Sequence, residues 1–343
     1  MKPRSKKAAR LADVARLAKV STATVSRALT LPHKVKAHTL ERVQRAAGTL
    51  GYVAHGAARA LASRRTHTIG AVVPTLDNAI FANTIHALQR TLDAAGYVLL
   101  LASHEFNAQT EVRVTRALME RGIDGLVLLG TTHHPDIYRM IEAHGLPYVL
   151  TWAFDGNGNH PCVGFDNRAA AVRIANYLLD LGHRRFAVIS GLTAQNERAQ
   201  ERLAGVRAAL AARGVRLAED RVIEKPYTHA GGQEGLRAVM TGREPPTAVI
   251  CGNDVLAIGA VAECHRQGLA VPDDVSITGF DDMEMAALMA PALTTVRFPT
   301  TDLGVYAANH LLLRLAGKAV DLRCKLPTEL VVRESTAQPR ISG

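Results

Sequence analysis

The feature that most constrains the fold is a regular alternation of short apolar runs with helical patterns, which begins at Thr68. Strands alternating with helices at this interval predict parallel sheets with helices on both faces. The runs form two series: TIGAVVP, YVLLLA, GLVLLG and PYVLTW, then RFAVISG, RVIEK, TAVICG and VSITGF. The helices between them are expected at 81–95, 109–121, 135–144, 168–181, 199–213, 232–240 and 254–267. The two series together are too long to form one compact sheet. We therefore expect two similar α/β subdomains with a cleft between them.

The excess positive charge is confined to the first fifth of the chain. Residues 1–65 hold 15 Lys and Arg against 2 Asp and Glu, whereas the remaining 278 residues carry a net charge of −3. A basic segment attached to a near-neutral body indicates a module that binds a polyanion, and a solubilising tail is the simpler alternative.

The basic segment also has a helical pattern, which favours a folded module over a tail. Apolar residues recur at helical spacing over 11–18, 21–29 and 35–50, and Ser21 is a candidate N-cap for the second helix. Val25 and Leu29 are expected to face the core of this small domain. Three short helices with a tight first turn are typical of a helix-turn-helix. The alanine-rich stretch that follows is expected to be a linker that becomes helical only under some conditions.

Several classes of protein are disfavoured by what the sequence lacks. The four cysteines form no CxxC pair, which argues against a structural zinc site and a disulfide scaffold and fits a reducing cytoplasm. No apolar stretch approaches a membrane span or the core of a signal peptide. TIGAVVPTLDNA holds no G-x-G-x-x-G, so a dinucleotide enzyme is disfavoured. We expect no catalytic residues, no metal and no cofactor, and we interpret His183 as a structural turn residue.

Residues 11–61 resemble the DNA-binding end of the lac-repressor (LacI) family. The resemblance rests on Asp13–Val14–Ala15, Val20–Ser21 and Thr24–Val25–Ser26–Arg27. Later landmarks extend it over essentially the whole chain: LGY at 50–52, LGHRR at 181–185, RLAG at 202–205, NDVLAIG at 253–259, GLAVPDDVSITGFDD at 268–282, PALTTV at 291–296 and ELVVREST at 329–336. One departure is Lys19, which stands at a turn position where the family usually has glycine.

The resemblance implies a helix-turn-helix domain over 1–53, a hinge helix over 54–66 and an effector and dimerisation domain over 67–343. That last domain resembles periplasmic sugar-binding proteins, with one subdomain at about 67–164 and 298–325 and the other at about 165–297 and 326–343. The resemblance also implies that the second helix of the DNA-binding domain lies in the major groove of DNA. The residues expected at DNA are Ser21, Thr22, Ala23, Thr24, Arg27, His55, Ala58 and Leu61, with Leu61 as an apolar wedge in the minor groove. For Thr22 and Ala23, plain helix surface is the alternative.

In the cleft, the resemblance implies a small polar effector held by donors, acceptors and aromatic rings. The expected residues are Phe81, Trp152, Arg198, Arg202, Tyr227, Asn253 and Asp281. Three of them have a structural alternative: core packing for Phe81, a helix cap for Asp281 and an ion pair for Arg202.

The sequence therefore predicts a cytoplasmic DNA-binding transcriptional regulator, interpreted as a repressor, that acts as a homodimer on operator DNA. VGFDN at 163–167, ECHRQGLAVPDD at 263–274 and Arg198 look like the gluconate-utilisation regulators of the family. A sugar acid such as gluconate is accordingly the leading effector, and a neutral sugar is the other candidate. The alternative function is a periplasmic-type sugar-binding protein with no role at DNA.

Overall fold

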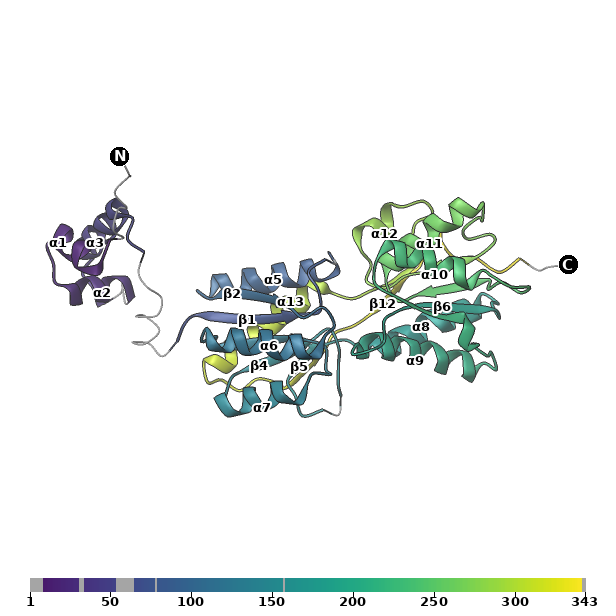
Figure 1. Ribbon diagram of the computed structural model, residues 1–343, viewed down its shortest axis with the longest axis horizontal. Helices are drawn as coiled ribbons and strands as arrows, with labels where there is room; N and C mark the ends of the chain where they lie inside the picture. Colours follow the sequence, from purple (N-terminus) through teal and green to yellow (C-terminus); the bar gives the residue numbers. More distant parts are fainter. Residues whose placement is uncertain (1–8, 31–33, 54–64, 78, 157, 341–343) are drawn as a thin grey trace. The chain divides into compact units, whose positions relative to one another are not determined.

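The computed structural model describes residues 9–30, 34–53, 65–77, 79–156 and 158–340. The chain divides into two compact units, Met1–His67 and Thr68–Gly343. The first unit is helical and the second is built from parallel sheets and helices (Figure 1). The expected fold class, a helix-turn-helix unit followed by an α/β body with parallel sheets, is confirmed.

The N-terminal unit packs three helices around a small core: α1 (Leu11–Ala18), α2 (Thr22–Thr30) and α3 (Ala37–Leu50). Each helix contributes a buried valine to this core, and these are Val14, Val25 and Val43. Leu29 packs partly buried against the same cluster. The expected inward face of the second helix is thus confirmed for both Val25 and Leu29.

The turn between α1 and α2 places Lys19 in the left-handed region, with φ 50° and ψ 50°. The glycine-like conformation expected at this position is therefore adopted by a residue with a Cβ. Arg42 of α3 stabilises the turn, because its guanidinium donates to the backbone oxygens of Ala18 and Lys19. Tertiary contacts of this kind offset the backbone strain.

The larger unit begins with a six-stranded sheet in the order β11-β5-β4-β3-β1-β2. Its strands are β1 (Thr68–Val73), β2 (Val98–Ser103), β3 (Gly125–Leu129), β4 (Tyr148–Thr151), β5 (Cys162–Gly164) and β11 (Arg323–Lys325). Every neighbouring pair in this sheet is parallel.

Helices cover both faces of this first sheet, as the alternation predicts (Figure 1). One face carries α5 (Ala82–Ala94), which the short η2 (Ala79–Phe81) precedes, together with α13 (Thr300–Leu315). The other face carries α6 (Ala108–Glu120) and α7 (Pro135–His144).

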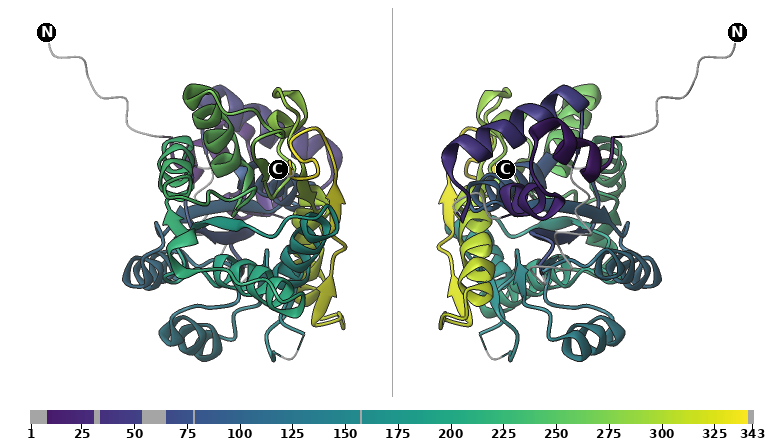
Figure 2. Two further views of the ribbon diagram at one scale, coloured as in Figure 1. Left: turned by 90° about the vertical axis from the view of Figure 1, so that its right-hand side faces the viewer. Right: turned by 90° about the vertical axis from the view of Figure 1, so that its left-hand side faces the viewer.

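The second half repeats this construction around a parallel sheet in the order β7-β6-β8-β9. Its strands are β6 (Phe186–Gly191), β7 (Val222–Lys225), β8 (Ala248–Cys251) and β9 (Ser276–Thr278). The helical segments around it are α8 (Asn167–Asp180), α9 (Glu197–Ala212), η3 (Glu219–Arg221), α10 (His229–Val239), α11 (Asp254–Gln267) and α12 (Glu284–Leu288). Helices α8 and α9 pack together, as do α10 and α11, and an end-on view shows the helices on the two sides of the sheets (Figure 2).

The chain passes between the two halves after Gly164, after Arg297 and after Lys325. Near these passages β10 (Thr295–Arg297) pairs antiparallel with β12 (Glu329–Val331). His183 lies beside the second half's C-terminal segment, and its ring nitrogens contact Thr247 Oγ1 and the Ala337 carbonyl, each at 2.9 Å. These bonds match the structural role expected for this histidine.

Candidate functional site

The exposed N-terminal face of α2 is the candidate DNA-reading surface. Ser21, Thr22, Ala23 and Arg27 are exposed and Thr24 is half-buried. Ser21 is the expected N-cap, because its Oγ accepts the backbone N–H of Thr24 at 3.1 Å. The hydroxyls of these two residues also bond to each other at 2.9 Å.

That face therefore combines small side chains with a helix N-terminus in a basic unit. Thr22 and Ala23 leave the backbone close to the surface, and Arg27 adds a long donor in the last turn of α2. A helix with small residues at its N-terminus approaches base edges closely in the major groove. The other residues expected at DNA, His55, Ala58 and Leu61, lie outside the described residues.

The candidate effector site lies where strands of the two sheets end. In each sheet the first strand lies between the second and the third, so the strand order reverses beside β1 and beside β6. Ligands of open parallel sheets bind outside the carboxyl ends of the strands at such points. The expected effector residues follow these ends: Phe81 after β1, Trp152 after β4, Arg198 and Arg202 after β6, Tyr227 after β7, Asn253 after β8 and Asp281 after β9.

Arg202 is the best-anchored of these side chains. Its Nε donates to Asn167 Oδ1 at 2.8 Å and its Nη1 donates to the Gly252 carbonyl at 2.7 Å. Its guanidinium carbon lies 3.5 Å from the centroid of the Phe280 ring, and Nη1 lies 3.7 Å from Asp281 Oδ1. Desolvation lowers the pKa of Arg202, while the Asp281 charge opposes that shift. The arginine is thus buried and held in one orientation.

Asp281 is buried without the hydrogen bonds that a carboxylate needs. Both of its oxygens lack a hydrogen-bond partner among the described residues, and its backbone φ of 113° is strained. Burial raises the pKa of Asp281, and the charge of Arg202 opposes this only in part. The helix-cap alternative does not hold, because α12 begins at Glu284 with Met283 as its N-cap. Buried polar groups are normally paired, so Asp281 is a candidate to accept hydrogen bonds from ligand hydroxyls.

Asn253 and Trp152 each contribute a further donor that has no partner in the described part of the chain. Asn253 caps α11 by accepting the Leu256 N–H through Oδ1 at 3.0 Å, which leaves Nδ2 unbonded. Trp152 is fully buried at φ 68°, and its Nε1 is also unbonded. Asn167 connects Arg202 to Trp152, because it accepts from Arg202 and donates to the Trp152 carbonyl at 3.1 Å. The sequence did not single out Asn167 as a site residue.

An aromatic cluster lies behind Trp152. Phe81 meets Trp152 edge to face with ring centroids 4.7 Å apart, and Phe298 does so at 5.2 Å. Phe165 stacks on Phe298 at 4.0 Å. Phe81 therefore packs in the core, as its alternative interpretation predicts, and it supports the indole from behind.

Tyr227 is buried near the guanidinium groups of Arg202 and Arg198. A Cβ at Gly191 would collide with its ring, so the glycine at the end of β6 makes room for it. Burial raises the pKa of Tyr227, while the charges of Arg202 and Arg198 act in the opposite direction. The phenol is accordingly a neutral donor and acceptor beside the two arginines.

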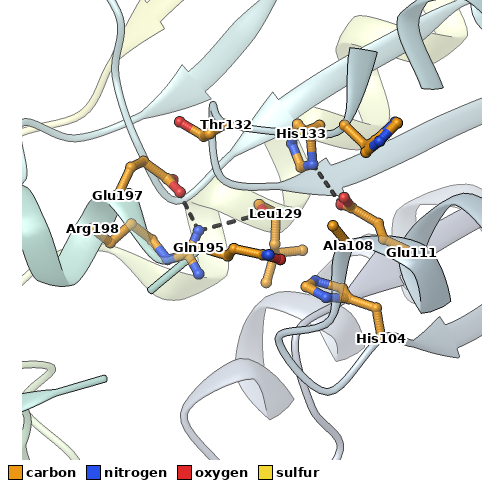
Figure 3. A pocket seen from close by; sticks show the side chains of 10 residues that line it. His104, Ala108, Glu111, Leu129, Thr132, His133, Gln195, Glu197 and Arg198 are labelled. Carbon is orange, nitrogen blue, oxygen red and sulfur yellow. Dashed lines mark hydrogen bonds and ion pairs between the residues drawn. The ribbon is translucent and has the colours of Figure 1, made fainter. Parts of the chain in front are cut away.

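Arg198 lines two cavities and bonds to the first half of the larger unit. Figure 3 shows the smaller of these cavities. Arg198 Nη1 donates to Glu197 Oε1 at 3.0 Å and to the Leu129 carbonyl of the first half at 3.4 Å. Glu197 also accepts the backbone N–H of Thr131 at 2.9 Å. One cavity has a volume of about 410 Å³. The other, of about 190 Å³, is lined by Arg198 together with side chains that the sequence did not point to.

Two negative findings apply to the residues that the structure describes. They include no cluster of three or more His, Cys, Asp or Glu side chains arranged to hold a metal ion. None of their helices is both long and apolar enough to span a bilayer.

Family models match both units of this chain. The model for bacterial regulatory proteins of the lacI family matches residues 10–55, and the model for a periplasmic binding protein-like domain matches residues 175–336. The fold and the site thus define a regulator that joins a helix-turn-helix to a periplasmic-binding-protein-like body.

Full-length relatives lead to the family itself. The chain is 34% identical over 330 residues to the HTH-type transcriptional repressor CytR of Escherichia coli K12, an alignment that spans 96% of each chain. The structure of the transcription regulator GntR from Chromobacterium violaceum is 34% identical with a TM-score of 0.74, covering 78% of this chain and 99% of that one. A CelR–cellobiose complex is 30% identical with a TM-score of 0.70, covering 95% and 99%. This chain belongs to the LacI family of bacterial regulators.

Proposed function

We propose that this protein is a cytoplasmic transcriptional repressor that binds operator DNA as a homodimer and whose operator affinity is controlled by a small sugar or sugar acid. The observation that carries the proposal is the pairing, in one chain, of an exposed recognition helix with a buried set of unpartnered polar atoms around Arg202. The first is suited to a DNA groove, and the second to a ligand rich in hydroxyl groups.

A polyol supplies what the unpartnered atoms lack. Its hydroxyls donate to the oxygens of Asp281 and accept from Asn253 Nδ2 and Trp152 Nε1. Arg202 is already oriented by Asn167 and needs no rearrangement to take part. The CelR structure that resembles this chain holds cellobiose, which supports a sugar as the ligand class.

Within that class we favour a sugar acid, with gluconate as the first compound to test. Arg198 is buried beside the cleft and has one acidic partner, Glu197, among the described residues. A guanidinium binds a carboxylate with charge-assisted bonds that a neutral sugar does not form. A homodimer is expected because two recognition helices read the two half-sites of a palindromic operator.

One titration experiment tests the proposal. The full-length protein is titrated onto a duplex that it selects from a random pool, at several salt concentrations, with gluconate, glucose, cellobiose or a nucleoside present. Affinity should fall by about 10³-fold or more between 50 and 200 mM salt if six or more phosphates are contacted. Gluconate should change the affinity, and glucose should change it less.

The Arg198→Ala variant should keep operator binding but lose the response to gluconate. Arg207→Ala is the matched control, because Arg207 lies on the same helix and pairs with the exposed Glu219. A protein that selects no duplex yet binds sugars would instead be the sugar-binding protein without a role at DNA. A response restricted to neutral sugars or nucleosides would refute the sugar-acid assignment.

A further inference from the structure

The smaller cavity beside Arg198 is lined mostly by residues with polar side chains, which come from both halves (Figure 3). It is bordered by the segments that follow β2 and β3 on one side and by the start of α9 on the other. The polar residues that line it include His104, Glu111, His133, Gln195, Glu197 and Arg198. Its volume of about 190 Å³ is large enough for a small polar group such as a carboxylate or a phosphate.

His104 has an unused hydrogen-bonding atom in this cavity. The residue is 8% exposed, and its Nδ1 has no hydrogen-bond partner among the described residues. The ring lies beside Gln195 and Ala108 in the space that Arg198 borders from the opposite half (Figure 3). An unpaired polar atom in a buried site costs free energy unless a ligand or water pairs with it.

The neighbouring histidine is already occupied. His133 Nδ1 donates to Glu111 Oε1 at 2.6 Å, and its Nε2 lies 3.1 Å from the Gly130 carbonyl. Both of these partners are hydrogen-bond acceptors, so neither ring nitrogen of His133 is left without a contact. Burial raises the pKa of Glu111, but the hydrogen bond from His133, the charges of the nearby histidines and a backbone hydrogen bond from His134 together outweigh it, so the net shift is downward. Glu111 is therefore a carboxylate with a hydrogen-bond partner.

Both acidic side chains that line the cavity already have partners. Glu111 is paired with His133, and Glu197 is paired with Arg198 and with the backbone N–H of Thr131. Arg198 uses Nη1 for its bonds to Glu197 and Leu129, and a guanidinium has further N–H groups to offer. Ala108, at the cavity wall, begins α6, and a helix N-terminus favours negative charge. A cation has no set of three ligands here among the described side chains.

We propose that this cavity is the anion subsite of the effector cleft, and that His104 takes up one proton from water when a carboxylate enters beside Arg198. The inference rests on the proposed sugar-acid effector and adds a residue and a proton to its recognition. Protonated His104 and Arg198 would then hold the carboxylate from the two halves of the molecule, so the anion would draw the halves together.

The direction of the pH effect follows from the charges that face His104. Burial lowers its pKa, and His133 and Arg198 lower it further, while Glu111 and Glu105 act in the opposite direction. His134 and Glu197 line the same cavity. An anion in the cavity favours the protonated ring, so the pKa of His104 is higher with ligand than without it. Affinity should therefore rise as pH falls between those two values, by up to about tenfold per pH unit.

Titration calorimetry on the full-length protein tests this inference. Gluconate and, separately, inorganic phosphate are titrated between pH 5.5 and 8 in two buffers of different ionisation enthalpy, which counts the protons taken up. The variants are His104→Gln, which keeps a polar side chain but cannot be protonated, and His265→Gln, a control at an exposed histidine of α11. The buffer comparison on the unmodified protein gives a result even where a variant fails to fold.

The expected result is uptake of up to one proton per anion by the unmodified protein and by His265→Gln, and none by His104→Gln. Gluconate binding with no proton uptake, or with uptake that persists in His104→Gln, would overturn the inference and leave the sugar-acid effector standing. Phosphate binding with His104-dependent uptake, together with no gluconate binding, would support the subsite and refute gluconate. Binding of neither anion would overturn both.

Discussion

At the scale of single residues, Asp254 in the second half is an acid whose pKa is shifted by burial. It is fully buried at the start of α11, where Oδ1 accepts from the Thr295 hydroxyl at 2.6 Å and Oδ2 accepts from the Met283 N–H at 2.7 Å. Burial raises its pKa to about 7, although those two hydrogen bonds act in the opposite direction. The folded protein thus holds a proton here that the unfolded chain releases near pH 4.

This proton makes the free energy of unfolding depend on pH. Between about pH 4 and 7 the unfolded chain has lost the proton while the folded protein keeps it, so stability should fall as pH rises, by about 1.4 kcal/mol per unit, and should level off above pH 7. Asp254→Asn should remove this component. Urea unfolding of both proteins at pH 5, 6 and 7 measures it, and parallel pH profiles would contradict the assignment.

Single residues of the candidate effector site also differ in how far the sequence predicts them. Arg202, Asp281 and Asn253 follow strand ends, and the motifs around them indicate their role directly. The sequence assigned no role to Asn167 or His104, because the contacts that suggest one, such as that of Asn167 with Arg202, join parts of the chain that are distant in sequence. Contacts of that kind become visible only when the two halves are in place.

At the scale of elements, the turn between α1 and α2 carries a measurable strain. Lys19 adopts a left-handed conformation that glycine reaches without steric cost. Lys19→Gly should therefore stabilise the helix-turn-helix unit by about 0.5–1 kcal/mol. Hydrogen exchange of the α1 and α2 amides in the full-length protein measures the change.

Lys19→Ala is the control for that experiment, because it removes the same charge but keeps the Cβ. It should give no gain in protection. Equal protection in the two variants would mean that the charge of Lys19, rather than its backbone conformation, determines the stability of the turn.

Long helices within the strand–helix alternation were predicted well because each has several independent signals. Both α7 and α11 begin and end at the expected residues, and each is followed by a left-handed glycine, Gly145 or Gly268. Helix α13 and the three-residue strands β5, β10, β11 and β12 were not predicted. A strand of three residues is too short to show a period, and α13 returns to the first half after the alternation has ended.

At the scale of the whole molecule, polar contacts join the two halves beside the candidate effector site. Glu197 and Arg198 of the second half bond to the backbone of Thr131 and Leu129 in the first. An anion at Arg198 competes with Glu197 for the same guanidinium, so ligand binding should alter the contacts that fix the relative position of the halves. A change of this kind is what an operator-bound dimer would sense through its two N-terminal units.

Such coupling must be reciprocal in the two binding equilibria. If the effector changes the dissociation constant for the selected operator by some factor, saturating operator must change the dissociation constant for the effector by the same factor, typically 5–150-fold. Fluorescence anisotropy with labelled duplex gives the first factor, and calorimetry of effector binding with and without unlabelled duplex gives the second. Glu197→Gln weakens the contact between the halves, so it should alter both factors equally. Two factors that differ beyond error would show that the effector acts outside the binding equilibrium, for example through aggregation, and would contradict control by an allosteric cleft.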